Sequence, residues 1–371
     1  MRELNKSFWD FTTIIGTTTL SVPLMLVSES IQARYLGPSN YGKVTLVLSA
    51  ISLLYLFGLS WLRTSFMRFG KEEFVNTGRL RKTTANFLVN NVYSFIIISI
   101  VFYVFRDSIF DFLEIQHSFA YWIILLGCLI VFFKNFVFEL LKVIRLIKLQ
   151  AFLHRLATKM FILFGMLLFV FHILEINVNY VIAIYLLSDI IIIIIGFYFI
   201  KPKYLFPLVF DKGMIKTIYF YSFPLIFSSW SAYVIDWIDT YVIKFFMNLE
   251  DVGIYQASYK IFKTLKSFWS VGIVTVTQPI IMVFRTNNQI NKIKNFYIKR
   301  LIPQVSFLGM ILISLIILFT DFGLNLLYGS EFSQSILPFK ILIASQNFTI
   351  ISSMLTAILL SFDMTKFLSI L

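Results

Sequence analysis

Three lysines lie inside a strongly apolar stretch of the sequence, where positive charge is unfavourable. Lys260, Lys263 and Lys266 occur within residues 253–284, which are apolar enough to form a membrane span. An ionised side chain at the centre of a bilayer costs at least about 2.5–3.5 kcal/mol, so such groups usually face a polar cavity. At positions i, i+3 and i+6 of a helix, the three lysines share one face. We therefore predict that they line a cavity for an anionic substrate.

Two aspartates on the preceding apolar segment are candidates for the same cavity. Asp236 and Asp239 lie within residues 218–246, and a short turn around Glu250 joins this segment to the lysine-bearing one. A helical hairpin would place the aspartates at the depth of the lysines, because each residue advances the helix by about 1.5 Å. Two interpretations stay open. Either the aspartates only neutralise two lysines and hold the hairpin, or the lysines present net positive charge and the aspartates tune it.

Other ionisable residues lie in the remaining apolar segments. Four basic residues lie near segment ends, where a long side chain can reach the membrane surface: Arg34, Lys134, Arg155 and Lys159. We include Arg34 among the candidates for the substrate cavity. Glu29 and Asp189 have no such escape, so each is either a proton- or cation-coupling site or a neutral carboxyl that is hydrogen-bonded to a neighbour.

The overall composition predicts that membrane helices position these residues. Of the 371 residues, 58% are hydrophobic and 14% are charged, and the mean hydropathy is +0.84. Soluble domains have roughly 45–50% apolar and about 25% charged residues, so a soluble enzyme and a disordered chain are both excluded. The sequence predicts an all-α polytopic membrane protein with about ten spans: 11–33, 42–62, 84–105, 118–138, 152–174, 178–200, 218–246, 253–284, 296–320 and 336–362.

The basic residues predict the orientation of these spans. With a cytoplasmic N-terminus, 24 of the 32 lysines and arginines fall in inside segments, 5 fall outside, and the other 3 are the lysines within 253–284. This distribution follows the positive-inside rule. It also explains most of the net charge of +13, so we expect no nucleic-acid partner.

A weak internal repeat divides the chain into two predicted lobes. The motif S-V-P-L at residue 21 returns as S-F-P-L at residue 222, and each is followed by a turn that leads into a glycine, Gly42 or Gly253. Internal repeats of this kind are typical of transporters built from two related lobes. We expect a six-helix N-terminal lobe at 1–203 and a C-terminal lobe at 204–371. Because the second lobe has only four spans, we expect it to be incomplete, through truncation or natural shortening.

The sequence contains no pattern for catalysis or metal binding. No G-x-x-x-x-G-K-[ST] loop, H-E-x-x-H pair or G-x-S-x-G elbow occurs, and the three histidines are scattered. The single cysteine, Cys128, is expected to be a small buried hydrophobic residue. We therefore expect neither an enzyme nor a cofactor.

Residues 33–42, A-R-Y-L-G-P-S-N-Y-G, resemble the A-R-x-L-G-P-x-x-Y-G turn that ends the first span of the polysaccharide-biosynthesis flippases. These are the Wzx-type proteins of O-antigen and capsule synthesis, in the MATE-like transporter superfamily. The matching residues are Arg34, Leu36, Gly37, Pro38, Tyr41 and Gly42. Two further matches are similar to the family pattern: an Asp followed by G-x-Y-x-A (Asp239, Gly253, Tyr255, Ala257), and L-Y-G-x-x-F from residue 327.

The resemblance implies two pseudo-symmetric lobes that alternate access to a central cationic cavity. The implied substrate is an undecaprenyl-pyrophosphate-linked oligosaccharide, flipped from the inner to the outer leaflet of the bacterial inner membrane. By location and charge, Lys260, Lys263 and Lys266 would meet its pyrophosphate or acidic sugars. An H⁺ or Na⁺ gradient or the removal of product, rather than ATP, would drive the movement. Implied partners are the lipid-linked oligosaccharide, membrane lipids, and the polysaccharide polymerase and chain-length proteins.

Three other functions were weighed against this one. A MATE-type exporter of cationic drugs would favour an acidic cavity, which the three lysines oppose. A lipid II flippase is physically close, but the A-R-x-L-G-P turn favours the polysaccharide branch. A membrane-embedded glycan polymerase or ligase should have a long outside loop rich in Arg and His, and the sequence has no such loop.

Overall fold

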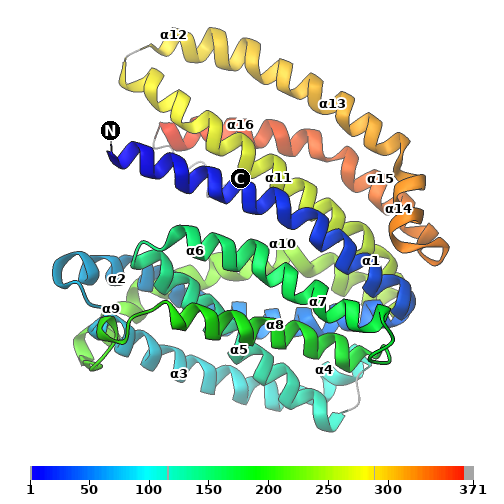
Figure 1. Ribbon diagram of the computed structural model, residues 1–371, viewed down its shortest axis with the longest axis horizontal. Coiled ribbons are helices and arrows are strands. Elements are labelled where there is room, and N and C mark those ends of the chain that lie inside the picture. Colours follow the sequence, from blue (N-terminus) through cyan, green and yellow to red (C-terminus); the bar gives the residue numbers. More distant parts are fainter. Residues whose placement is uncertain (1, 115–116, 288, 363–371) are drawn as a thin grey trace. The chain divides into compact units, whose positions relative to one another are not determined.

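The computed structural model describes residues 2–114, 117–287 and 289–362, and these ranges contain helices and no strand (Figure 1). The first helices are α1 (Arg2–Gly58), α2 (Arg63–Thr77), α3 (Arg81–Val104), α4 (Arg106–Leu113), α5 (His117–Val143), α6 (Ile147–Ala151), α7 (Thr158–Val170) and α8 (Val178–Tyr198). The later ones are α9 (Lys212–Ser222), α10 (Leu225–Phe246), α11 (Leu249–Thr286), α12 (Ile290–Lys292), α13 (Ile302–Leu318), α14 (Thr320–Tyr328), α15 (Ile336–Ala344) and α16 (Gln346–Ser361).

The prediction of an all-helical, multi-pass membrane protein is confirmed. Among the described residues, seven helical segments are long and apolar enough to cross a membrane, and an eighth is obtained when α9 and α10 count as one bent span. Each of the ten predicted spans overlaps helix. The counts differ partly because α1 contains the first two predicted spans in one helix. In addition, the apolar part of α11 includes residues 267–276, whose side chains lie outside the described part.

The predicted turn at Gly37 reverses the direction of α1. Gly37 has φ 69° and ψ 169°, a conformation that residues with a side chain rarely adopt, and Pro38 starts the second half. The Tyr41 hydroxyl donates a 2.7 Å hydrogen bond to Glu29, although 12 residues of straight helix would separate them by about 18 Å. The two halves of α1 are therefore folded against each other, as Figure 1 shows.

The two glycines of the internal repeat meet where α1 crosses the start of α11. A Cβ atom on Gly42 would lie 2.2 Å from the Leu249 carbonyl oxygen, and one on Gly253 would lie 1.9 Å from the Pro38 carbonyl oxygen. Close backbone contact through small residues is a common way for membrane helices to pack. The two turns of the predicted repeat are therefore in direct contact.

The two repeat prolines have different surroundings. Pro224 lies between α9 and α10, whose axes differ by 46° at this break. Pro23 lies within α1, where Gly37 is the position with non-helical backbone angles. The S-x-P-L motif therefore accompanies a bend in the second copy, and the bend of the first copy comes later, at Gly37.

The segment between α8 and α9 is held against α3 by polar contacts. Asp211 caps α9 by accepting hydrogen bonds from the backbone N–H groups of Gly213 and Met214, and it pairs with Lys82 at 2.5 Å. The Lys82 ammonium and these two N–H groups hold the pKa of Asp211 below its usual value. The Asn86 side chain also accepts a hydrogen bond from the Asp211 backbone N–H. The segment is thus anchored at its end.

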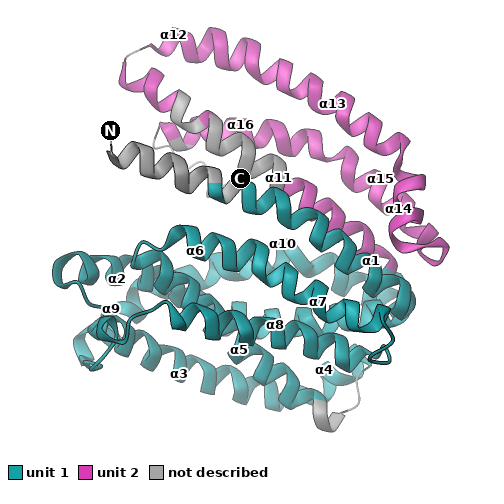
Figure 2. Ribbon diagram, in the orientation of Figure 1, with its two compact units in different colours: residues 1–253 teal, residues 254–371 magenta. Residues whose placement is uncertain are grey.

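The chain forms two compact units, residues 1–253 and 254–371 (Figure 2). In the first unit, α1 packs on α5, α7 and α8. In the second unit, α13 packs on α16, and a core around Ile281, Tyr297 and Met354 includes a 3.1 Å hydrogen bond from the Tyr297 hydroxyl to the Met354 carbonyl. The lobes predicted at 1–203 and 204–371 were defined by the internal repeat and not by packing, so they stay a prediction.

We predict that Gly42→Ala lowers the stability of the fold by about 1–3 kcal/mol, because the added methyl group must displace the α11 backbone. The measurement is the thermal unfolding midpoint of the purified, detergent-solubilised protein. Gly16→Ala in the same helix is the control, since its Cβ would meet no atom within 4 Å. Equal midpoints for the two variants would show that the crossing does not require glycine.

Candidate functional site

Glu29 is buried in the first unit with tyrosine hydroxyls around its carboxyl group. It is 6% exposed and accepts the hydrogen bond from Tyr41 across the Gly37 reversal. The Tyr185 hydroxyl, from α8, lies 3.3 Å from Glu29 and 2.9 Å from the Gln32 side-chain oxygen. Two interpretations of Glu29 were open, a hydrogen-bonded carboxyl and an ion-coupling site. The structure shows the hydrogen bonds. Ion coupling at this carboxyl stays a prediction.

Asp189 forms an ion pair with Lys134. The Lys134 ammonium, on α5, lies 2.6 Å from an Asp189 carboxylate oxygen on α8, and both side chains are mostly buried. A lysine near a segment end can reach the membrane surface, but the Lys134 ammonium group turns to Asp189, whose carboxylate is within reach. The pair is neutral as a whole, so any coupling ion at Asp189 would have to compete with Lys134.

A second carboxylate on α5 is shared by two cations. Glu139, which is 2% exposed, accepts hydrogen bonds from Arg63 and, at 3.1 Å, from Lys142. Two positive groups on one carboxylate give this three-residue cluster a net charge of +1. The sequence pattern did not identify Arg63 as a partner of Glu139. The i, i+3 spacing of Glu139 and Lys142 was the available signal.

Another basic residue of the first unit is bound inside the helix bundle. Arg155, in the turn between α6 and α7, donates to the Thr18 hydroxyl on α1. The neighbouring His154 ring packs edge-on against Phe138 with centroids 4.9 Å apart. Its place near a segment end would also allow Arg155 to reach the membrane surface. It instead reaches the helix that carries Glu29.

The three predicted substrate lysines lie on α11 in the second unit. Lys260 is half-buried, whereas Lys263 and Lys266 are exposed. The Lys263 ammonium lies 6.0 Å from the Tyr259 ring centroid, and that of Lys266 lies 6.0 Å from the Phe262 centroid, within range of a cation–π interaction. The lysines are therefore presented on one helix beside aromatic rings. We call them the lysine row.

The remaining predicted cavity residues belong to the first unit. Asp236 and Asp239 are half-buried on α10, and an Asp239 carboxylate oxygen accepts a 3.2 Å hydrogen bond from the Thr240 backbone N–H. Arg34 is exposed on α1, close to the Gly37 reversal. Whether these residues and the lysine row line one cavity stays a prediction.

The family turn motif has structural roles in the first unit. Gly37 and Pro38 make the reversal, Tyr41 binds Glu29, and Gly42 admits the α11 backbone. Leu36 is buried in the core. The motif is thus explained by local packing. Within the described ranges, no cluster of three or more His, Cys, Asp or Glu residues has the geometry of a metal site.

The comparisons with known proteins agree with this architecture. The family described as "Polysaccharide biosynthesis protein" matches residues 9–284. The fold is similar to a lipid II flippase MurJ in an inward closed conformation, with TM-score 0.67 and 16% identity over 94% of this chain and 76% of that one. It is also similar to an inward-facing multidrug resistance MATE family transporter of the MOP superfamily, with TM-score 0.61 and 14% identity over 91% and 83%.

No curated protein sequence matches the chain. The resemblance inferred from the turn motif is confirmed by the family match and by the shared fold. Identities of 14–16% establish the fold alone.

We predict that Lys134 and Asp189 are energetically coupled. Lys134→Met and Asp189→Asn should each destabilise the protein, because each leaves a mostly buried group without its partner. The double variant should recover about 2 kcal/mol of the summed loss. The measurement is a double-mutant cycle on unfolding in detergent. The control is the exposed Lys340–Asp321 pair at 2.8 Å, whose coupling should be about 0–1 kcal/mol. Equal coupling in both pairs would contradict a buried role for the first.

Proposed function

The chain belongs to the polysaccharide biosynthesis protein family, and on this basis we propose that it is a flippase for lipid-linked oligosaccharides. The substrate we propose is an undecaprenyl-pyrophosphate-linked repeat unit of O-antigen or capsule. The protein moves it from the inner to the outer leaflet of a bacterial inner membrane. The observation that carries the proposal is the lysine row, which presents three ammonium groups along one helix beside aromatic rings.

The chemistry of such a substrate explains why charged residues lie within apolar helices. A pyrophosphate and its sugars cannot enter a hydrocarbon layer about 30 Å thick without polar partners. Ammonium groups offer the pyrophosphate charge-assisted hydrogen bonds, and the half-buried Tyr259 ring beside Lys263 offers a surface for a sugar face. The row is almost two helical turns long, about 9 Å, so the anion can pass from one lysine to the next.

The energy source that we propose is an ion gradient or the removal of product. The sequence has no phosphate-binding loop, and translocation forms or breaks no covalent bond. The protein is thus proposed to be a transporter and not an enzyme. Glu29 and Asp189 are the candidate sites for H⁺ or Na⁺. Glu29 is bound by the Tyr41 hydroxyl and Asp189 by Lys134, so an ion at either carboxyl would compete with these contacts.

Two related functions remain as alternatives. The first alternative is a MATE-type exporter of cationic drugs, because the fold is also similar to that of a multidrug resistance MATE family transporter. The lysine row argues against it, because like charges repel a cationic substrate. Lipid II also carries a pyrophosphate, so a lipid II flippase would need the same lysines. The turn motif and the family match favour the polysaccharide substrates.

We predict that Lys263→Ala reduces surface glycan without reducing insertion into the membrane. The loss of one charge-assisted hydrogen bond should lower the transport rate by about tenfold. The measurement is surface glycan, together with the amount of protein in the membrane fraction. Lys263→Arg should retain activity, and the exposed Lys294→Ala is the matched control. Wild-type transport by Lys263→Ala would remove the lysine row from the mechanism.

The proposed orientation places the N-terminus in the cytoplasm. We predict that a cysteine at Asn248 reacts with an impermeant thiol reagent from outside, whereas one at Ile290 reacts only after the membrane is permeabilised. The physical reason is the concentration of lysine and arginine in the inside segments. The measurement is labelling in intact and in lysed cells. The reverse pattern would overturn the topology.

A further inference from the structure

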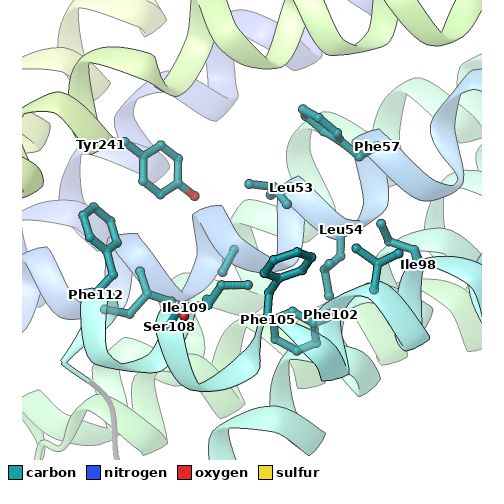
Figure 3. Close-up of a pocket in the computed structure, with 13 residues that line it drawn as sticks. Leu53, Leu54, Phe57, Ile98, Phe102, Phe105, Ser108, Ile109, Phe112 and Tyr241 are labelled. Carbon is teal, nitrogen blue, oxygen red and sulfur yellow. The ribbon is translucent and has the colours of Figure 1, made fainter.

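The first unit contains an apolar pocket that the proposed transport does not use. Its volume is about 560 Å³, and it lies between the second half of α1, α3, α4 and α10 (Figure 3). Among its walls are Leu54, Phe57, Phe102, Phe105 and Phe112, and none of its lining residues is charged. The volume falls within the roughly 300–1,000 Å³ typical of ligand sites.

The pocket wall has two side-chain hydroxyls. One already has hydrogen-bond partners in the protein, and the other lies at the edge of the pocket. Tyr241 is the lining residue from α10, and its hydroxyl is 2.6 Å from the Tyr233 hydroxyl and 3.0 Å from the Ser49 hydroxyl. Ser108 is exposed on α4. A polar ligand would therefore lose its hydration without gaining partners inside the pocket. The lining selects a hydrocarbon chain.

Exposure of the lining residues shows where such a chain enters. Leu54 and Phe102 are each 3% exposed, whereas Val101 and Phe105 on α3 are 45% and 58% exposed. Because α3 is apolar enough to cross the membrane, its exposed apolar side faces hydrocarbon rather than water. The pocket thus opens between helices toward the lipid, and its floor lies against α1.

The charges beside the pocket determine the kind of headgroup. Arg106 and Asp107 form a 3.2 Å ion pair at the start of α4, and Lys244 on α10 pairs with Glu114 after the end of α4. Asp111 adds a third carboxylate. Two cations and three carboxylates match a headgroup that carries both a phosphate and an ammonium. They disfavour the pyrophosphate of a carrier lipid, which has several negative charges and no positive one.

We propose that this pocket binds one acyl chain of a zwitterionic phospholipid, with phosphatidylethanolamine as the fitting headgroup. The phosphate lies near Arg106 and the ammonium near the carboxylates of Asp107 and Asp111. The acyl chain fills the space under Phe102 and Phe105 and braces α10 against α1. This lipid site shares no residue with the lysine row, so it stands whether or not the proposed substrate is right.

The test is photolabelling of the purified full-length protein in detergent micelles. The probe is a phosphatidylethanolamine with a diazirine on one acyl chain, and crosslinked peptides are identified by mass spectrometry. Label is expected on the α3 and α4 peptides that contain Phe102, Phe105 and Phe112. Label spread evenly over exposed apolar helix surfaces would overturn the proposal.

Two variants separate the pocket from the lipid-facing surface around it. Ile98→Trp fills the pocket and should reduce labelling roughly tenfold. Ile97→Trp is the matched control on the adjacent residue, which is 63% exposed and outside the lining, and labelling should not change. If Ile98→Trp does not fold, Ser108→Trp at the exposed edge gives the same test. Unchanged labelling in a folded pocket variant would overturn the proposal.

Competition identifies the headgroup. Unlabelled phosphatidylethanolamine should displace the probe, and phosphatidylglycerol, which has no ammonium, should do so roughly threefold less well. Equal competition by phosphatidylglycerol would overturn the headgroup assignment. Stronger competition by undecaprenyl phosphate would show that the pocket holds the tail of a carrier lipid instead.

Discussion

Backbone hydrogen bonding in a hydrocarbon layer is the constraint on which the rest of this structure depends. Every backbone N–H and C=O group in the hydrocarbon layer needs a hydrogen-bond partner within the protein. The chain can therefore change direction only where the loss of helical hydrogen bonds is tolerated. In α1 that position is Gly37, followed by Pro38. The reversal brings Tyr41 to Glu29 and sets Gly42 against the α11 backbone. One glycine conformation thus determines both a buried polar contact and a helix crossing.

The two units handle charge differently. In the first unit, Lys134 pairs with Asp189, and Glu139 is bound by Arg63 and Lys142, so buried carboxylates meet cations directly. In the second unit, Lys263 and Lys266 are exposed beside aromatic rings. Charge that is matched within a bundle stabilises it or holds its geometry, whereas exposed charge on an apolar segment is accessible from outside the bundle. The exposure of Lys263 and Lys266 is the physical basis for proposing the lysine row as the substrate site.

Features that depend on neighbouring residues were predictable from the sequence, and features that depend on packing were not. Helical spans follow from continuous apolar stretches, and the turn follows from the Gly37–Pro38 pair. The Lys134–Asp189 and Arg63–Glu139 pairs join residues 55 and 76 positions apart, so no spacing rule reveals them. The lipid pocket likewise arises from four helices, none of which carries a signature for it. Glu29 was found as a candidate, but its tyrosine partners were not.

The crossing of Gly42 and Gly253 also has a consequence for biosynthesis. The two glycines are 211 residues apart in the chain, so the α1 hairpin enters the membrane long before its partner backbone exists. At about 5–20 residues per second, the ribosome needs about 10–40 s to deliver Gly253. During that interval the bare glycine surface of α1 is open to lipid, to the insertion machinery and to other nascent helices. The time order of translation, and not only the final packing, therefore limits which residues this surface can carry.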